Sequence, residues 1–353
     1  ALAFGARGIV VHGASAARAD WLVAALRAGG AQVLTLAATG EPTLHDLTAA
    51  TETARPHDPD WVMSMGGGAA IDLGKALAAM VPTPGDAMDH LEVVGRGLPL
   101  AAAPLPFLAL PTTAGTGAEV TRNAVIGLPG HGRKVSLRDD RMIARLAIID
   151  PALTDLCPRA VTLASGLDAV TQVIEPWIGA KATPYSDAIA GVAIRPGLMA
   201  LKRLMAAEDA DARDALAWVS LSGGLALANS GLGAVHGLAG VIGGMVPAAH
   251  GAICGALLGP VLAMNRDLTD GMARARVDHV CANIAEIFGG TADTAPDRLR
   301  LWARDQGLPD LRAQGLSPAL HARVAEAALA SSSMKGNPVP PPIGALHRVL
   351  DSA

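Results

Sequence analysis

Short apolar runs and helical patterns alternate along the first part of the chain, and this alternation ends near residue 155. Repeated strand-helix units of this kind predict a parallel sheet that is covered by helices. The predicted strands span 8–12, 31–36, 61–65, 107–110, 124–127 and 147–150, and the predicted helices span 15–28, 44–53 and 69–80.

Beyond residue 155 the strand patterns fade, and Ala- and Leu-rich helical patterns continue to the C-terminus. Turn-forming residues interrupt these patterns at 182–184, 289–290 and 337–342. A chain of 353 residues also exceeds what one hydrophobic core usually serves. We therefore predict an α/β domain over residues 1–155 and an all-helical domain over residues 156–353.

Composition narrows the class of protein. A hydrophobic content of 51% with 17% charged residues predicts a globular chain, and a net charge of -4 offers no surface for nucleic acid. The three cysteines, Cys157, Cys254 and Cys281, are widely spaced and form no CxxC motif. They are expected to be reduced, buried thiols of a cytoplasmic protein.

Residues 215–265 contain no Asp, Glu, Lys or Arg, which raises the question of a membrane span. Glycines interrupt the stretch repeatedly and no aromatic belt flanks it, so no span is expected. The chain opens in Ala-Leu-Ala-Phe-Gly, without a Met or a basic leader. We expect N-terminal residues to be missing and no signal peptide.

A phosphate-binding loop is predicted where the third strand runs into Gly66, Gly67 and Gly68 and then a helix with Asp72 and Lys75. Glycines allow close approach of the backbone, and a helix N-terminus offers N–H groups to a diphosphate. A tight turn would leave the same pattern. Asp72 and Lys75 could equally form an exposed pair on the helix.

A second candidate loop, Pro-Thr-Thr-Ala-Gly-Thr-Gly at 111–117, follows the fourth strand. Its hydroxyl groups, on Thr112, Thr113 and Thr116, are expected at the carboxyl end of the sheet, where open α/β folds bind ligands. An ordinary loop rich in Gly and Thr is the alternative interpretation.

Candidate metal ligands lie in the helical part. His236 and His250 occupy the uncharged stretch, and two buried imidazoles on neighbouring helices can share one divalent cation. Upstream, Asp168 and Gln172 are four residues apart, so a helix points their oxygens in one direction. Hydrogen-bonded core histidines and a helix-start Asp remain the structural alternative.

Taken in order, the glycine loop, the 111–117 segment, Gly-Leu-Asp-Ala at 166–169 and the two histidine segments resemble the iron-containing (group III) alcohol dehydrogenases. The resemblance covers nearly the whole chain and implies a dehydroquinate synthase-like architecture. It implies a Rossmann-like dinucleotide-binding domain, a helical metal-binding domain and a nicotinamide cofactor, NAD with NADP left open. It also matches Lys134 to a basic residue near that cofactor, although a solvated charge on a strand end is the alternative.

Carried over by position, the family's ligands to Fe²⁺ or Zn²⁺ fall on Asp168, Gln172, His236 and His250. Gln172 stands where the family usually has His, and a neutral amide oxygen is a poorer ligand than imidazole. Gly240 stands where the family usually has another His near the substrate. Both departures put metal identity and the route of proton transfer in question.

The resemblance implies hydride transfer between a small alcohol and its aldehyde or ketone, with Asp168, His236 and His250 at the catalytic centre, and at least a homodimer. Three alternatives stay open. A dehydroquinate synthase-like lyase or a maleylacetate reductase-like enzyme would need a basic pocket for an acidic substrate. A nicotinamide-binding protein without metal catalysis would fit the changes at Gln172 and Gly240.

Gln172→His should tighten binding of a divalent metal, because an imidazole replaces a neutral amide oxygen. Equilibrium titration of the metal-free wild type and variant with Zn²⁺ measures the change. Unchanged or weaker affinity in the variant would remove residue 172 from the ligand set.

Overall fold

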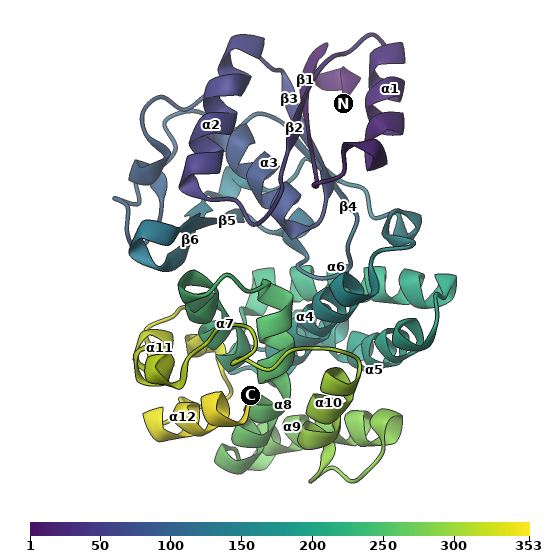
Figure 1. The fold of residues 1–353 in the computed structure, drawn as a ribbon, viewed down its shortest axis with the longest axis vertical. Helices are drawn as coiled ribbons and strands as arrows, with labels where there is room; N and C mark the ends of the chain where they lie inside the picture. The colour runs from purple at the N-terminus through teal and green to yellow at the C-terminus, as the bar shows by residue number, and fades with distance from the viewer. The chain divides into compact units, whose positions relative to one another are not determined.

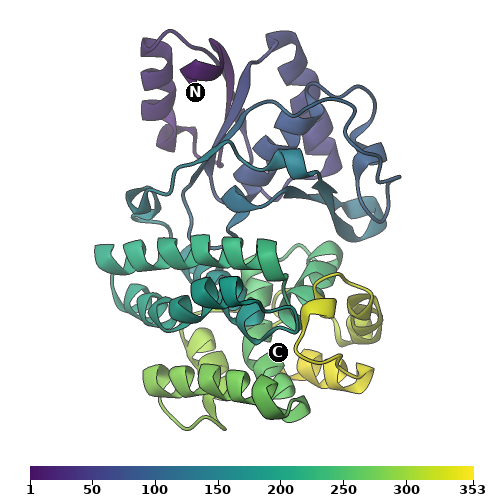
Figure 2. The same cartoon turned by 180° about the vertical axis from the view of Figure 1, so that it is seen from behind.

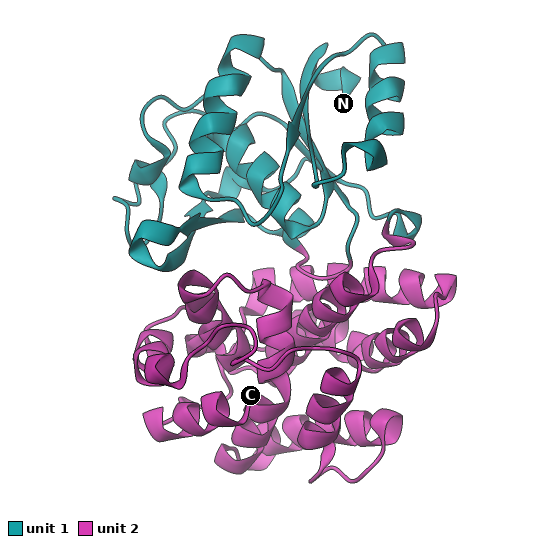
Figure 3. Ribbon diagram, viewed as in Figure 1, with its two compact units in different colours: residues 1–113, 118–153 teal, residues 114–117, 154–353 magenta.

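The computed structural model describes residues 1–353, which divide into two compact units (Figure 3). Unit 1 comprises Ala1–Thr113 and Ala118–Leu153, and unit 2 comprises Ala114–Gly117 and Thr154–Ala353. The division after Leu153 lies slightly before the position expected from the sequence. The sequence pattern did not anticipate that four residues of the second candidate loop pack with the helical unit.

Unit 1 holds a five-stranded sheet in the order β2-β1-β3-β4-β7, with every neighbouring pair parallel (Figure 1). This confirms the predicted α/β class. The sheet strands and helices are β1 (Arg7–His12), α1 (Asp20–Ala28), β2 (Gln32–Ala37), α2 (Leu44–Ala54), β3 (Trp61–Gly66), α3 (Gly68–Met80), β4 (Phe107–Pro111) and β7 (Leu146–Ala147).

Helices cover both faces of this sheet. Successive strand residues point to opposite faces, so Val10 and Met63 pack with α1 on one side. Ile9, Val11 and Val62 pack with α2 and α3 on the other. Because the central strands are buried on both faces, they read in the sequence as continuous apolar runs rather than as alternating ones.

The predicted strand at 124–127 exists but was wrongly expected to extend the main sheet. It lies within β5 (Asn123–Leu128), which pairs antiparallel with β6 (Arg133–Arg138) in a separate two-stranded sheet. The Pro-Gly-His-Gly sequence between the two strands reverses the chain, and Gly132 adopts a left-handed conformation there with φ of 57°. A strand joined by so short a turn pairs with its sequence neighbour.

Lys75 is fully buried, which makes the predicted alternative of an exposed pair with Asp72 wrong for the lysine. Its ammonium group donates to the carbonyl oxygens of Ala118, Thr121 and Asn123, at 2.5, 2.8 and 2.9 Å, and to the Thr121 hydroxyl. One side chain of α3 therefore fixes the segment that leads into β5.

Unit 2 contains only helices besides short turns, as the sequence predicted (Figures 1 and 2). The first of them, α4, is buried along most of its length and packs against α5, α6 and α8. The predicted breaks at 289–290 and 337–342 lie between helices, and the break at 182–184 ends at Pro184, the first residue of α5. The helices are α4 (Arg159–Ile178), α5 (Pro184–Ala206), α6 (Ala210–Ser230), α7 (Ala234–Met245), α8 (His250–Leu268), α9 (Gly271–Phe288), α10 (Ala295–Asp305), α11 (His321–Leu329) and α12 (Ile343–Ser352).

No single helix has the length and apolar composition needed to cross a membrane. Only α6 and α7 taken together reach this length and apolar composition, and these two helices are bent by 98° at their junction.

Lys75→Met should lower the free energy of unfolding by about 2–4 kcal/mol at neutral pH, because buried carbonyl oxygens lose their donor. Chemical denaturation measures the change, with Lys181→Met, at an exposed lysine, as the control that should stay within about 0.5 kcal/mol of wild type. Equal stability of the two variants would show that the buried contacts contribute nothing net.

The same comparison has a defined pH dependence. Burial lowers the pKa of Lys75 from its ordinary 10.5 to about 8, although Asp72 and Glu119 oppose the shift. Between these two values the unfolded chain binds more protons than the native protein, so this group's contribution to stability rises with pH and is lost as pH falls toward 8. The deficit of Lys75→Met relative to wild type should therefore grow from pH 8 toward pH 10, by up to roughly 3 kcal/mol. A deficit that shrinks over this range would contradict the assignment.

Candidate active site

The imidazole of His236 is held on one side by a buried carboxylate. Its Nδ1 lies 2.6 Å from Glu175 Oε2, and the other Glu175 oxygen accepts a hydrogen bond from the Val235 N–H at 2.7 Å. Val235 is in the first turn of α7, whose N-cap residue Gly233 provides no side-chain cap. Glu175 therefore caps α7 and orients His236 at the same time, which leaves Nε2 as the free ligand atom of the ring.

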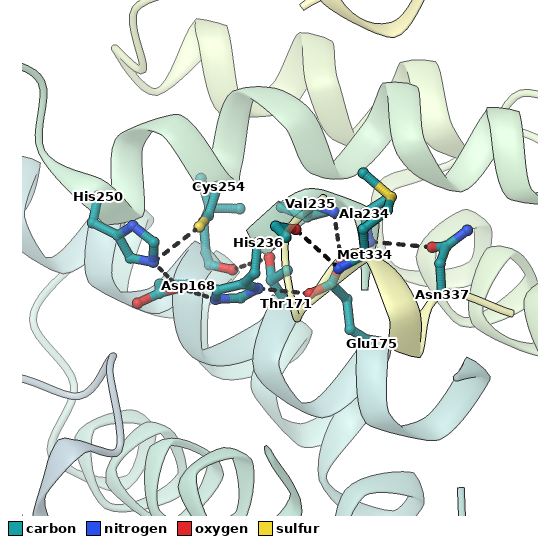
Figure 4. Close-up of polar contacts among 12 residues, drawn as sticks. Asp168, Thr171, Glu175, Ala234, Val235, His236, His250, Cys254, Met334 and Asn337 are labelled. Carbon is teal, nitrogen blue, oxygen red and sulfur yellow. Dashed lines mark hydrogen bonds and ion pairs between the residues drawn. The ribbon is translucent and has the colours of Figure 1, made fainter. Parts of the chain in front are cut away.

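Three further donor groups gather around His236 Nε2 (Figure 4). Asp168 Oδ1, from α4, lies 3.2 Å from that nitrogen and 4.0 Å from His250 Nε2. His250 is the first residue of α8, and Cys254 follows one turn later with its Sγ 3.6 Å from His250 Nε2. Ligand atoms of Asp168, His236, His250 and Cys254 all lie within 4.8 Å of one another.

The cluster is closed on most sides. Asp168, His236 and Cys254 are buried, whereas the His250 side chain is 30% exposed. Access to the site is therefore from the side of His250.

Gln172 lies beside this cluster on the same helix as Asp168, as its spacing predicted. Its amide donates a hydrogen bond to the Asp168 carboxylate. Its Oε1 is buried without a hydrogen-bond partner, which costs free energy unless a positive group is near. An unsatisfied oxygen on a residue that contacts Asp168 is compatible with a cation bound at the neighbouring cluster.

Charge in the cluster favours a cation. Burial alone disfavours protonated histidine, but interactions with Cys254 and with the nearby carboxylates outweigh it. They raise the pKa of His236 well above its ordinary value and that of His250 to about 9. Although burial opposes ionisation of Asp168, its hydrogen bond to His236 and the charges of both rings lower the pKa of this acid.

Two residues of the cluster were missed in the sequence. Glu175 follows Asp168 by seven residues, which places both on one face of α4, and this spacing was a usable signal. Cys254 follows His250 by four residues, also on one helical face, but was taken as a packing thiol.

The glycine loop of unit 1 lies where its sequence position predicted. Gly66 ends β3 and Gly67 is the N-cap of α3, with no side chain capping the helix. A Cβ at Gly66 would lie 3.2 Å from the Gly13 nitrogen, and one at Gly67 would lie 3.1 Å from Thr113 Oγ1. The loops after β1, β3 and β4 therefore meet at the edge of the sheet where these strands end. The strand order β2-β1-β3-β4-β7 changes direction between β1 and β3, and open α/β sheets bind ligands at such a point.

The other predicted cofactor residues are distributed around that region. Thr112 is buried, and its N–H donates to the Gly66 carbonyl oxygen at 3.0 Å. Asp72 is in α3 two residues after the buried Ala70. Lys134 is in β6 and forms an ion pair with Glu41, in the loop after β2, rather than standing as a solvated charge.

Thr116 lies in the segment that packs with unit 2. The Gly115 N–H donates to Ser220 Oγ in α6 at 2.8 Å. Gly117 has a φ of 59°, and a Cβ there would lie 2.5 Å from Gly224 Cα. The glycines of the 111–117 loop thus serve close packing on a helix as well as flexibility.

Gly240, where the sequence predicted the absence of a proton-transferring imidazole, has open space around it. It lies on α7 one turn after His236, and a Cβ at this position would meet nothing within 4 Å. No imidazole occupies this position.

Comparison with known proteins identifies two matching family models. The model described as iron-containing alcohol dehydrogenase matches residues 1–151. The model for the C-terminal part of the Fe-containing alcohol dehydrogenase family matches residues 162–353. Neither model describes a lyase, so the dehydroquinate synthase-like alternative gains no support.

Individual relatives agree with these models. A choline dehydrogenase of Bacillus subtilis (strain 168) is 30% identical over 332 residues, which cover 91% of this chain and 80% of that protein. An NAD-dependent methanol dehydrogenase of Bacillus methanolicus is 34% identical over 232 residues, 65% of this chain and 58% of the relative. The crystal structure of a 1,3-propanediol oxidoreductase superposes with a TM-score of 0.84 at 26% identity, covering 98% of this chain and 91% of that one.

Glu175→Gln should weaken Zn²⁺ binding by about 10–100-fold, because an amide next to His236 no longer fixes the ring as the carboxylate does. Competition against a chelating dye measures the affinity, and Glu326→Gln, at an exposed glutamate of α11, is the matched control. Wild-type affinity in Glu175→Gln would mean that the carboxylate serves only as a helix cap.

Proposed function

We propose the function of this protein from one premise: the chain belongs to the iron-containing alcohol dehydrogenase family. It is an oxidoreductase of the alcohol dehydrogenase type, and this family uses a divalent metal and a nicotinamide cofactor. The residues that perform these roles, the choice of cofactor and the substrate are our proposals. The observation that carries them is the buried convergence of Asp168, His236 and His250 in unit 2.

We assign Asp168, His236 and His250 as metal ligands, with Gln172 next to them as a candidate. These residues would hold a divalent cation, which would supply Lewis-acid polarisation of a substrate oxygen, and a nicotinamide would supply the hydride donor or acceptor. The carboxylate of Glu175 keeps the His236 ring in position, and burial of Asp168 excludes water from its side of the site. The partly exposed His250 marks the side from which a substrate enters.

We assign the dinucleotide mainly to unit 1. Gly66, Gly67 and Gly68 offer a backbone cradle and a helix N-terminus for the diphosphate. The hydroxyl groups of Thr112, Thr113 and Thr116, the carboxylate of Asp72 and the ammonium group of Lys134 complete the proposed contacts. NAD is preferred over NADP in this proposal, in keeping with the NAD-dependent methanol dehydrogenase among the relatives.

We propose a small alcohol and its aldehyde or ketone as substrate and product. The substrates named for the three relatives described above, choline, methanol and 1,3-propanediol, are small alcohols. Apolar residues precede both His236 and His250, which suits a substrate without acidic groups. We further propose that the protein is a cytoplasmic homodimer with a dinucleotide domain over residues 1–155 and a metal domain over 156–353.

The direct test combines metal analysis with absorbance of reduced nicotinamide. Metal-free protein is supplied with Fe²⁺ or Zn²⁺, NAD or NADP, and a series of short alcohols or their aldehydes. Turnover that requires both the metal and a nucleotide supports the proposal. Absence of metal binding together with retained nucleotide binding would favour a protein that only binds the cofactor.

His250→Ala should reduce metal retention and turnover at least about 100-fold while leaving dinucleotide affinity unchanged, because the imidazole belongs to unit 2 and the glycine loop to unit 1. Metal content per chain and fluorescence titration with the reduced nucleotide measure the two properties separately. His279→Ala, which removes an exposed imidazole of α9, is the control. Loss of both properties in His250→Ala alone would show that the two sites are not separable.

A further inference from the structure

Cys254 has a position that packing alone does not explain. It is fully buried on α8, one helical turn after His250, and its sulfur approaches the polar cluster rather than only apolar neighbours. Its Sγ lies 3.6 Å from His250 Nε2 and within 4.8 Å of ligand atoms on Asp168 and His236. Figure 4 shows this side chain pointing toward the same point as the two imidazoles.

The spacing of these atoms suits tetrahedral coordination. Bond lengths of ~2.0 Å to nitrogen and ~2.3 Å to sulfur at tetrahedral angles place neighbouring ligand atoms roughly 3.3–3.6 Å apart. The observed separations are 3.2 Å between Asp168 and His236, 3.6 Å between Cys254 and His250, and 4.0 Å between Asp168 and His250. Small side-chain adjustments would therefore bring all four groups to one ion.

Charge balance also favours the sulfur over the amide. Asp168 with two neutral imidazoles and a neutral Gln172 would leave one net positive charge on a buried divalent ion. A Cys254 thiolate supplies a second negative charge in direct contact with the ion, so the ion and its four ligands together are neutral, with the Glu175 carboxylate one shell further out. Gln172 already donates its amide N–H to Asp168, which makes it a supporting contact for that ligand.

We propose that Cys254 is the fourth protein ligand of the metal, as a thiolate, in the place that the amide at position 172 fills poorly. The inference rests on the proposed metal site and adds its donor set: one carboxylate, two imidazoles and one thiolate. Metal binding displaces to solvent the thiol proton and any extra proton that the two imidazoles carry in the metal-free protein, and no oxidation or reduction is involved. Because thiolate is a soft ligand, this set favours Zn²⁺ and Co²⁺ over Mg²⁺ or Mn²⁺.

Cobalt reports on the sulfur directly, without any measurement of turnover. Co²⁺ is added to the metal-free full-length protein, and the absorption spectrum is followed. A thiolate bound to Co²⁺ gives an intense charge-transfer band in the near ultraviolet, besides the weaker visible bands of a tetrahedral ion. We expect the wild type to show this band, saturating at one Co²⁺ per chain.

Four variants locate the source of the band. Cys254→Ser and Cys254→Ala should lose it and bind Zn²⁺ at least about tenfold more weakly. Cys281→Ser removes another buried thiol, on α9, and should keep the band. Gln172→Ala should also keep it. Circular dichroism of each variant confirms that the helical fold is retained.

The outcomes separate this inference from the function on which it rests. A wild-type cobalt spectrum with visible bands but no charge-transfer band would overturn thiolate ligation and leave the metal site of Asp168, His236 and His250 intact. Persistence of the band in both Cys254 variants would also overturn it. If the wild type binds neither Co²⁺ nor Zn²⁺, the proposed metal site fails, and this inference fails with it.

Discussion

The contact between the Glu175 carboxylate and His236 is the interaction on which the rest of the site depends. One oxygen satisfies a backbone N–H at the start of α7, and the other fixes which nitrogen of the imidazole faces Asp168. Gly233 is required for this arrangement, because a Cβ there would lie 2.8 Å from Glu175 Oε1. The position of a helix and the chemistry of a ligand are thus set by the same side chain.

The two units use buried charge in different ways. In unit 1 the ammonium group of Lys75 is surrounded by carbonyl oxygens and stabilises a loop. In unit 2 the buried groups near Asp168 are mostly donors of electron pairs, and Gln172 Oε1 has no partner. A buried polar cluster that is complete without a ligand indicates structure, whereas one that lacks a positive group indicates a binding site.

Local patterns in the sequence predicted the elements well but not their distant partners. The run from Trp61 into Gly66 and Gly67 identified a strand, a loop and a helix start because all three signals are contiguous. Pairing of β5 with β6 was missed, because the hydrophobic pattern of a strand does not specify which other strand it pairs with. The burial of Lys75 was missed for a similar reason: its acceptors lie more than forty residues away. Glu175 and Cys254 were within reach of helical spacing, but neither fitted the family's pattern of ligands.

The Ala114–Gly117 segment makes the helical unit discontinuous in sequence. Residues 154–353 expressed alone would lack the strand-derived loop whose Gly115 N–H meets Ser220 and whose Gly117 packs on Gly224. The helices of unit 2 therefore pack against a segment, Ala114–Gly117, that lies between two parts of unit 1 in the sequence. During synthesis from the N-terminus, these four residues emerge before the helices that will enclose them. The helical unit in this respect depends on a segment that precedes it in the chain, although each unit has a hydrophobic core of its own.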